Sequence, residues 1–137
     1  MRPRPPARRS VLTPCSSQNG NILATAALSG PSPDYFPVFE STDGGATWTY
    51  VSNLTDQVNG LGFTAQPALR ELPFAVGAYP KGTILGGGNS WGNTSTNIDL
   101  YASRDGARSW EFVSHVAQGG PPNTTNGATP VWEPYFL

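Results

Sequence analysis

The sequence has little charge and almost none of the side chains that bind metals or act as nucleophiles. Only 12% of its 137 residues are charged, the formal net charge is −1, and there is one cysteine and one histidine. A near-neutral chain lacks the basic face that nucleic-acid binding normally needs. Cys15 has no second cysteine for an internal disulfide, and one cysteine with one histidine is a poor basis for a zinc site. We therefore expect no nucleic-acid partner, no metal and no cofactor.

Long apolar runs and helical periodicity are also missing. No apolar segment approaches the roughly 20 residues of a membrane-spanning helix, so no membrane partner is expected. Residues 1–19 begin with arginines and prolines, and no apolar region of roughly 7–15 residues follows them, as a secretory signal would require. We predict that residues 1–19 are disordered and that this chain carries no signal peptide.

Glycine and proline are abundant instead. The chain contains 16 glycines and 14 prolines, roughly twice the usual share. They are spread along the whole sequence together with Ser, Thr and Asn, and aromatic residues make up 11% of the chain. This pattern predicts an all-β protein of many short strands joined by turns.

An internal repeat defines the organisation of the chain. The segment 20–23 matches 82–85, 41–48 matches 103–110, and 49–52 matches 111–114. The offset between the two copies is constant, without a gap, from the first match to the last. A repeat of this kind is typical of an array of similar structural units.

The central element of the repeat is an octapeptide whose two copies share the form S-x-D-G-x-x-x-W. Asp tolerates turn geometry, Gly supplies a positive φ, and Trp anchors the turn against the sheet. Apolar residues flank both copies, so each copy is predicted to be a turn between two strands. We assign structural roles to the main positions of the two octapeptides: Ser41, Asp43, Gly44, Trp48, Ser103, Asp105, Gly106 and Trp110.

A second, weaker repeat completes the unit. The segment 66–69 resembles 133–136, and each opens a short apolar stretch after a polar loop. The second unit then has predicted strands at 66–72, 83–87, 98–103 and 110–114. Four strands joined by consecutive hairpins form a blade of a β-propeller.

The octapeptide resembles the Asp-box, or BNR repeat, of the sialidase-like β-propellers. The resemblance covers residues 20–137, which we interpret as an incomplete propeller domain of about two four-stranded antiparallel blades from a parent that we expect to have six. Propellers close with about 4–8 blades, so the chain is expected to be truncated. The full-length parent is expected to be a monomer.

Topology predicts which end of the blades binds a ligand. The Asp-boxes join the third and fourth strands, and the loops at the opposite end are predicted to be long and polar: 29–37, 53–65, 88–97 and 115–132. Residues that open the first strand of a blade are best placed to reach an axial ligand. We therefore expect Glu133 to be a catalytic carboxylate, with substrate-binding roles for Gln66, Trp91, Asn89, His115 and Tyr35. Each of these side chains also has an ordinary structural explanation, such as a loop anchor or a surface salt bridge.

Three N-glycosylation sequons begin at Asn53, Asn93 and Asn123. Three in so short a chain fit a secreted eukaryotic protein, although Asn, Ser and Thr are common here. All three are predicted to lie in loops of the ligand end, so any glycans would have to occupy its outer rim.

The segments 123–134 and 35–41 resemble fungal secreted proteins of glycoside hydrolase family 93. That family contains exo-arabinanases, six-bladed propellers that act on arabinan with retention of configuration. The resemblance implies that Glu133 is the nucleophile and that the second carboxylate comes from a later blade. A sialidase is disfavoured because sialidases clamp a carboxylate with three arginines; beyond the N-terminal segment the chain has only Arg70, Arg104 and Arg108. A non-catalytic carbohydrate-binding propeller and a gene product without activity stay open.

Overall fold

The computed structural model describes residues 12–28 and 35–136, which contain eight β-strands and no helix. The strands are β1 (Leu12–Ser16), β2 (Ile22–Ala26), β3 (Tyr35–Ser41), β4 (Thr49–Thr55), β5 (Ala65–Glu71), β6 (Ile84–Trp91), β7 (Thr96–Ser103) and β8 (Glu111–Gly119). Within the described residues no helix is long and apolar enough to cross a membrane.

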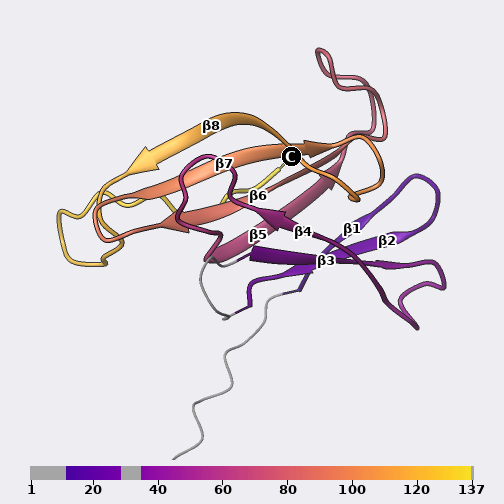
Figure 1. Cartoon of the computed structure of the whole chain (residues 1–137), viewed down its shortest axis with the longest axis horizontal. Coiled ribbons are helices and arrows are strands. Elements are labelled where there is room, and N and C mark those ends of the chain that lie inside the picture. Colours follow the sequence, from indigo (N-terminus) through magenta and orange to yellow (C-terminus); the bar gives the residue numbers. More distant parts are fainter. Residues whose placement is uncertain (1–11, 29–34, 137) are drawn as a thin grey trace, which may run out of the picture.

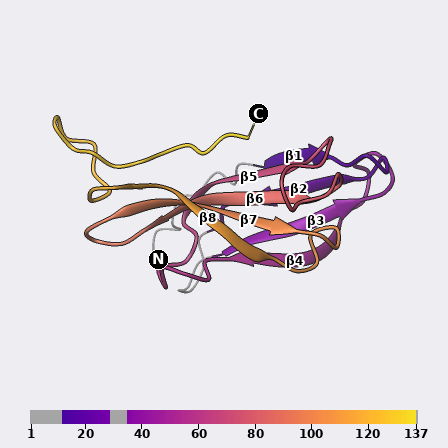
Figure 2. The ribbon, with the colours of Figure 1, turned by 90° about the horizontal axis from the view of Figure 1, so that it is seen from above.

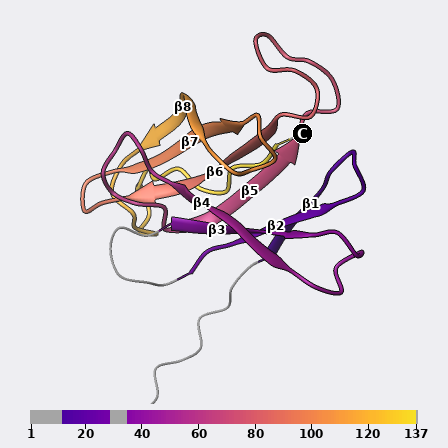
Figure 3. The same ribbon diagram turned by 45° about the vertical axis from the view of Figure 1, so that its right-hand side comes forward.

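The strands form two antiparallel four-stranded sheets, β1-β2-β3-β4 and β5-β6-β7-β8, each in sequence order. Figures 1 and 3 show them stacked as two layers. The predicted all-β fold with two propeller-like blades is confirmed. Each pair of neighbouring strands in a sheet is joined by a single connection, so each sheet is one meander, as expected for a blade.

The apolar core lies between the two sheets and is built from aromatic rings. Phe36 of β3 stacks on Phe63 with ring centroids 4.7 Å apart, and Phe63 meets Tyr101 of β7 edge-on at 5.6 Å. All three side chains are fully buried, and Leu54 of β4 joins them. Burial of this kind also raises the pKa of Tyr101 to about 12, because its phenolate would lose solvation.

The prediction of disorder for the whole of residues 1–19 is wrong, because Leu12–Ser16 forms β1 and pairs with β2. The first blade therefore has all four strands. β1 lies at the sheet edge, where a strand can include Pro14 without breaking a ladder of hydrogen bonds. Its inner contacts include the backbone N–H of Glu71, which donates to the buried sulfur of Cys15 at 3.2 Å. Residues 1–11 lie outside the described residues.

The predicted strands of the second blade are confirmed, but two of the predicted long loops are shorter than expected. β6 continues to Trp91 and β7 begins at Thr96, so only the turn 92–95 remains of the predicted loop 88–97. β8 continues to Gly119. The chain then leaves the sheet and runs back along it, as the yellow segment in Figure 2 shows. The residues 29–34 of another predicted loop lie outside the described residues.

Candidate functional site

The two ends of the blades differ in construction. At one end lie the β1–β2, β3–β4, β5–β6 and β7–β8 turns, on the right in Figure 1. At the other end lie the β4–β5 loop, the β6–β7 turn and the segment that follows β8. We call these the Asp-box end and, after the prediction made for its loops, the ligand end.

Each Asp-box is a closed network of hydrogen bonds. The Ser103 hydroxyl donates to Asp105 Oδ1 at 2.7 Å, and the same carboxylate accepts the backbone N–H and the hydroxyl of Ser109 at 2.9 and 2.6 Å. In the first copy, Asp43 makes the equivalent bonds to Ser41 and Thr47. These donors, led by the Thr47 and Ser109 hydroxyls, lower the pKa of both aspartates to about 2. A carboxylate so fully committed has no capacity left for proton transfer, so both aspartates stabilise turns.

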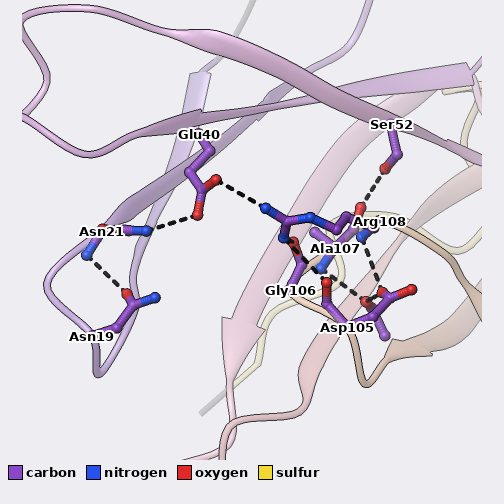
Figure 4. Close-up of polar contacts among 9 residues, drawn as sticks. Asn19, Asn21, Glu40, Ser52, Asp105, Gly106, Ala107 and Arg108 are labelled. Carbon is purple, nitrogen blue, oxygen red and sulfur yellow. Dashed lines mark hydrogen bonds and ion pairs between the residues drawn. The ribbon is translucent and has the colours of Figure 1, made fainter.

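A recess of about 770 Å³ lies at the Asp-box end between the two sheets. Its two carboxylates and Arg108 are already engaged, as Figure 4 shows for Glu40, which accepts from Asn21 at 2.8 Å and lies 3.5 Å from the Arg108 guanidinium. Glu71 accepts the backbone N–H of Gln18 with both oxygens. Because its polar groups bind one another, we do not place the functional site in this recess.

At the ligand end the structure brings together two of the predicted residues, Gln66 and Glu133, which share an unusual backbone geometry. Gln66 and Glu133, which are equivalent in the weak repeat, have φ angles of 57° and 58°. Left-handed φ is uncommon for residues other than glycine and is typically retained where the surroundings over-determine it. The backbone N–H of Glu133 donates to Gln66 Oε1 at 3.1 Å. The Glu133 side chain is exposed to solvent.

The segment that carries Glu133 is anchored by buried polar side chains. Asn89 Nδ2 donates to the Val131 carbonyl at 2.7 Å, and the Val131 N–H donates to Thr96 Oγ1 at 2.8 Å. Asn89 and Thr96 are both fully buried. Asn89 Oδ1 has no hydrogen-bond partner among the described residues. Asn89 therefore supports the backbone two residues before Glu133, a contact that its loop-like sequence neighbours did not predict.

Aromatic side chains flank this anchored segment. Trp91, at the end of β6, meets Trp132 edge-on with ring centroids 5.2 Å apart. Trp132 is 36% exposed and lies directly before Glu133. Gln66, Asn89, Trp91 and Glu133 thus gather at one end of the second sheet. Trp132 and Thr96 join them, although neither was predicted to have a role of its own.

The other two predicted site residues lie elsewhere. His115 Nδ1 is 2.7 Å from Asp99 Oδ1 on β7, and its ring contacts Phe112. The buried Asp99 also accepts from Asn59 of the β4–β5 loop. This loop is ordered by Asp56, whose burial opposes ionisation, while the N–H groups of residues 58, 59, 61 and 62 lower its pKa. Tyr35 opens β3 opposite Thr55. No hydrogen bond or ring contact joins His115 or Tyr35 to Glu133 in the described ranges.

The fold and the two Asp-boxes define a segment of an Asp-box β-propeller with an aromatic and carboxylate group at its ligand end. No protein-family model matches the chain, and no curated protein matches it. Solved structures do match. The α-L-arabinofuranosidase from Fusarium graminearum in complex with an iminosugar inhibitor is 44% identical, with a TM-score of 0.89 over 93% of this chain and 37% of that chain.

Two further solved structures match the chain to a similar degree. The Fusarium graminearum family 93 α-L-arabinofuranosidase with arabinobiose is 45% identical, with a TM-score of 0.88 over 92% of this chain and 36% of that chain. The Penicillium chrysogenum α-L-arabinanase with arabinobiose is 46% identical, with a TM-score of 0.87 over 94% and 38%. The predicted resemblance to glycoside hydrolase family 93 propellers is confirmed. The chain spans little more than a third of the length of these relatives.

Proposed function

We propose that this chain forms part of a secreted glycoside hydrolase that acts on arabinan with retention of configuration, and that Glu133 is its nucleophile. The observation that carries the proposal is the geometry at Glu133. A left-handed backbone, a hydrogen bond to Gln66 and an anchor from Asn89 fix a solvent-exposed carboxylate at the ligand end. Two relatives that share this fold bind arabinobiose.

The surroundings of Glu133 suit a furanose substrate. The Trp91–Trp132 pair offers apolar ring surface on which the C–H face of a sugar can pack. Retaining hydrolysis needs a second carboxyl about 5–5.5 Å from the nucleophile, which would protonate the leaving oxygen and then activate water. We assign that group to another part of the full-length protein.

The sequons support secretion of the full-length protein. Asn53, Asn93 and Asn123 are all exposed, so a glycosyltransferase can reach each of them in the folded chain. Asn53 lies within β4 and not in a loop as predicted, but it faces solvent at the sheet edge. Expression through a eukaryotic secretory route should give a chain whose mass falls on treatment with a glycan-removing amidase. An unchanged mass would count against the secretory assignment.

The catalytic role of Glu133 can be tested in a chimera. Residues 12–136 of this chain replace the matching segment of the Fusarium enzyme, and release of arabinose from linear arabinan is measured. We expect the chimera to be active and Glu133→Gln to lose at least about 1,000-fold in kcat, since a nucleophile cannot be replaced by an amide. Glu111→Gln, which changes an exposed glutamate at the Asp-box end, is the matched control. Equal activity of the two variants would refute the assignment.

A carbohydrate-binding propeller without hydrolysis is the second candidate. It is favoured by one observation. Retaining hydrolysis needs two carboxyl groups, and among the described residues Glu133 is the acidic member of the ligand-end group, whereas the buried carboxylate of Asp99 on β7 is held by His115 and Asn59. A chimera that binds arabinobiose but releases no product, with an unmodified Fusarium enzyme active in parallel, would favour this candidate.

A further inference from the structure

The hydroxyl of Thr96 ties together the two ends of the loop that precedes Glu133. Thr96 opens β7 and is fully buried. Its hydroxyl donates to the Gly120 carbonyl at 3.1 Å and accepts the backbone N–H of Val131 at 2.8 Å. A hydroxyl has one proton to donate and can accept another, so both backbone groups depend on this one side chain.

The two ends of this loop lie in close contact. The N–H of Gly120 donates to the Thr129 carbonyl at 2.9 Å. A Cβ at Gly119 would lie 2.5 Å from the oxygen of the same carbonyl and 2.8 Å from the Val131 nitrogen. Residues 120–129 thus form an Ω-loop, a surface loop whose ends meet, and Thr96 bonds to the chain on both sides of its neck.

Beyond the neck, the segment 131–136 runs back along the second sheet without forming a strand. Its backbone groups are bound by side chains from three neighbouring strands, namely Gln66 of β5, Asn89 of β6 and Thr96 of β7. In a ladder of backbone hydrogen bonds, most substitutions leave the bonds in place. Here the bonds come from side chains, so the place of the segment depends on which residues those three strands carry.

Trp132 and Glu133 directly follow the residue whose N–H Thr96 binds. Trp91, the partner of Thr96 in the register of β6 and β7, meets the Trp132 ring at 5.2 Å. We propose that Thr96 is a positioning residue of the ligand end, whose hydroxyl closes the loop and thereby sets the place of Trp132 and Glu133. Because Thr96 is fully buried, it acts through these two residues and not by contact with a substrate.

The effect on the segment can be measured in the 137-residue chain without any activity. Thr96→Val keeps the shape of the side chain and removes the hydroxyl. The N–H of Glu133, which donates to Gln66 and not to Thr96, should then exchange with solvent deuterium about 10-fold faster. Thr96→Ser keeps the hydroxyl and should exchange like the wild type. If the Glu133 N–H is as protected in Thr96→Val as in the wild type, the proposal is wrong.

A matched control separates positioning from a general loss of stability. Thr83 is buried at the Asp-box end, where its hydroxyl donates to the Pro80 carbonyl at 2.8 Å. Thr83→Val should leave exchange at Glu133 unchanged, and equal acceleration by both valine variants would overturn the proposal. Thr96→Ala also removes the hydroxyl and should repeat the result of Thr96→Val. It takes the place of that variant if circular dichroism shows that the valine prevents folding.

The effect on catalysis rests on the proposed function and is measured in the chimera with the Fusarium enzyme. A displacement of about 1 Å can lower a rate about 100-fold, so Thr96→Val should lower kcat on linear arabinan by about that factor. Thr96→Ser and Thr83→Val should retain the activity of the parent chimera. If Glu133→Gln abolishes activity but Thr96→Val does not lower it, the positioning role is wrong and the nucleophile stands. If Glu133→Gln stays active, the proposed function fails, and the exchange measurement still decides the role of Thr96.

Discussion

Replacement of Gly88 by alanine tests the packing between the two sheets, because no methyl group fits there. A Cβ at position 88 would lie 2.3 Å from Cε2 and 2.7 Å from Cζ of Phe36, and 3.1 Å from the Ala65 carbonyl oxygen. The Phe36 ring cannot move aside easily, since it is fully buried and stacked on Phe63 at 4.7 Å. Backbone and ring must therefore both shift.

The expected cost can be estimated from two opposing effects. Overpacking of a well-packed core costs about 1–3 kcal/mol, while alanine in place of glycine in a strand returns about 0.5–1 kcal/mol of backbone entropy. The net destabilisation is about 1 kcal/mol, within a range of about 0–2.5 kcal/mol. With a urea m-value of about 2 kcal/mol/M, the unfolding midpoint should fall by about 0.5 M.

The assay is urea unfolding followed by tryptophan fluorescence, with Gly92→Ala as the matched control. The same methyl group at position 92 meets only the flexible Leu61 side chain at 3.1 Å. The control should keep its midpoint or gain slightly. A Gly88→Ala variant as stable as the control would show that the sheets do not pack as described.

Three further predictions follow from single contacts. The hydrogen bonds of the Asp105 carboxylate lower its pKa to about 2 in the folded chain, so they stabilise the fold at pH values above the unfolded pKa near 4, and this stability is lost as the pH falls toward 2. The urea midpoint of Asp105→Asn should therefore lie below that of the wild type at pH 6, and the difference should narrow by pH 2. A double-mutant cycle of Trp110→Phe and Ser52→Ala should give a coupling energy of about 0.5–1.5 kcal/mol; a coupling near zero would exclude their hydrogen bond. Burial raises the pKa of the Cys15 thiol, so a thiol reagent at pH 8 should modify it much more slowly in the native chain than in urea, and equal rates would contradict its burial.

The strands of the second blade could be predicted because their signals are local. The Asp-box chemistry depends on residues that lie within one octapeptide, and the constant offset of the repeat projects the pattern from one blade to the other. β1 could not be predicted in this way. Its Pro14 reads as a loop signal, and only its place at the sheet edge makes a strand possible there.

The β6–β7 region was misjudged for a related reason. Gly86, Gly87 and Gly88 resemble a flexible loop in the sequence, but each lies in β6 with an aromatic ring or backbone carbonyl where a Cβ would be. Glycine is present at these positions because other atoms approach the backbone closely, not because the segment is flexible. The contacts of Gly86 with Leu54 and of Gly88 with Phe36 arise only when the two sheets have packed.

The candidate site was predicted in part. The topology of a blade indicated that Gln66 and Glu133 lie at the ligand end, whereas their direct hydrogen bond joins distant parts of the chain and has no sequence signal. The pair formed by the buried Asp99 and the exposed His115 was missed as a unit. A charged residue between the apolar Ile98 and Leu100 could have indicated that Asp99 has a polar partner.

The location of the ligand end is tested most directly by nuclear magnetic resonance. The chain has four tryptophans, and each indole N–H gives one resolved signal that single Trp→Phe variants can assign. Titration with arabinobiose should shift the signals of Trp91 and Trp132 and leave those of Trp48 and Trp110 in place. Shifts confined to the two Asp-box tryptophans, or no shift at saturating sugar, would contradict a carbohydrate site at the end that carries Glu133.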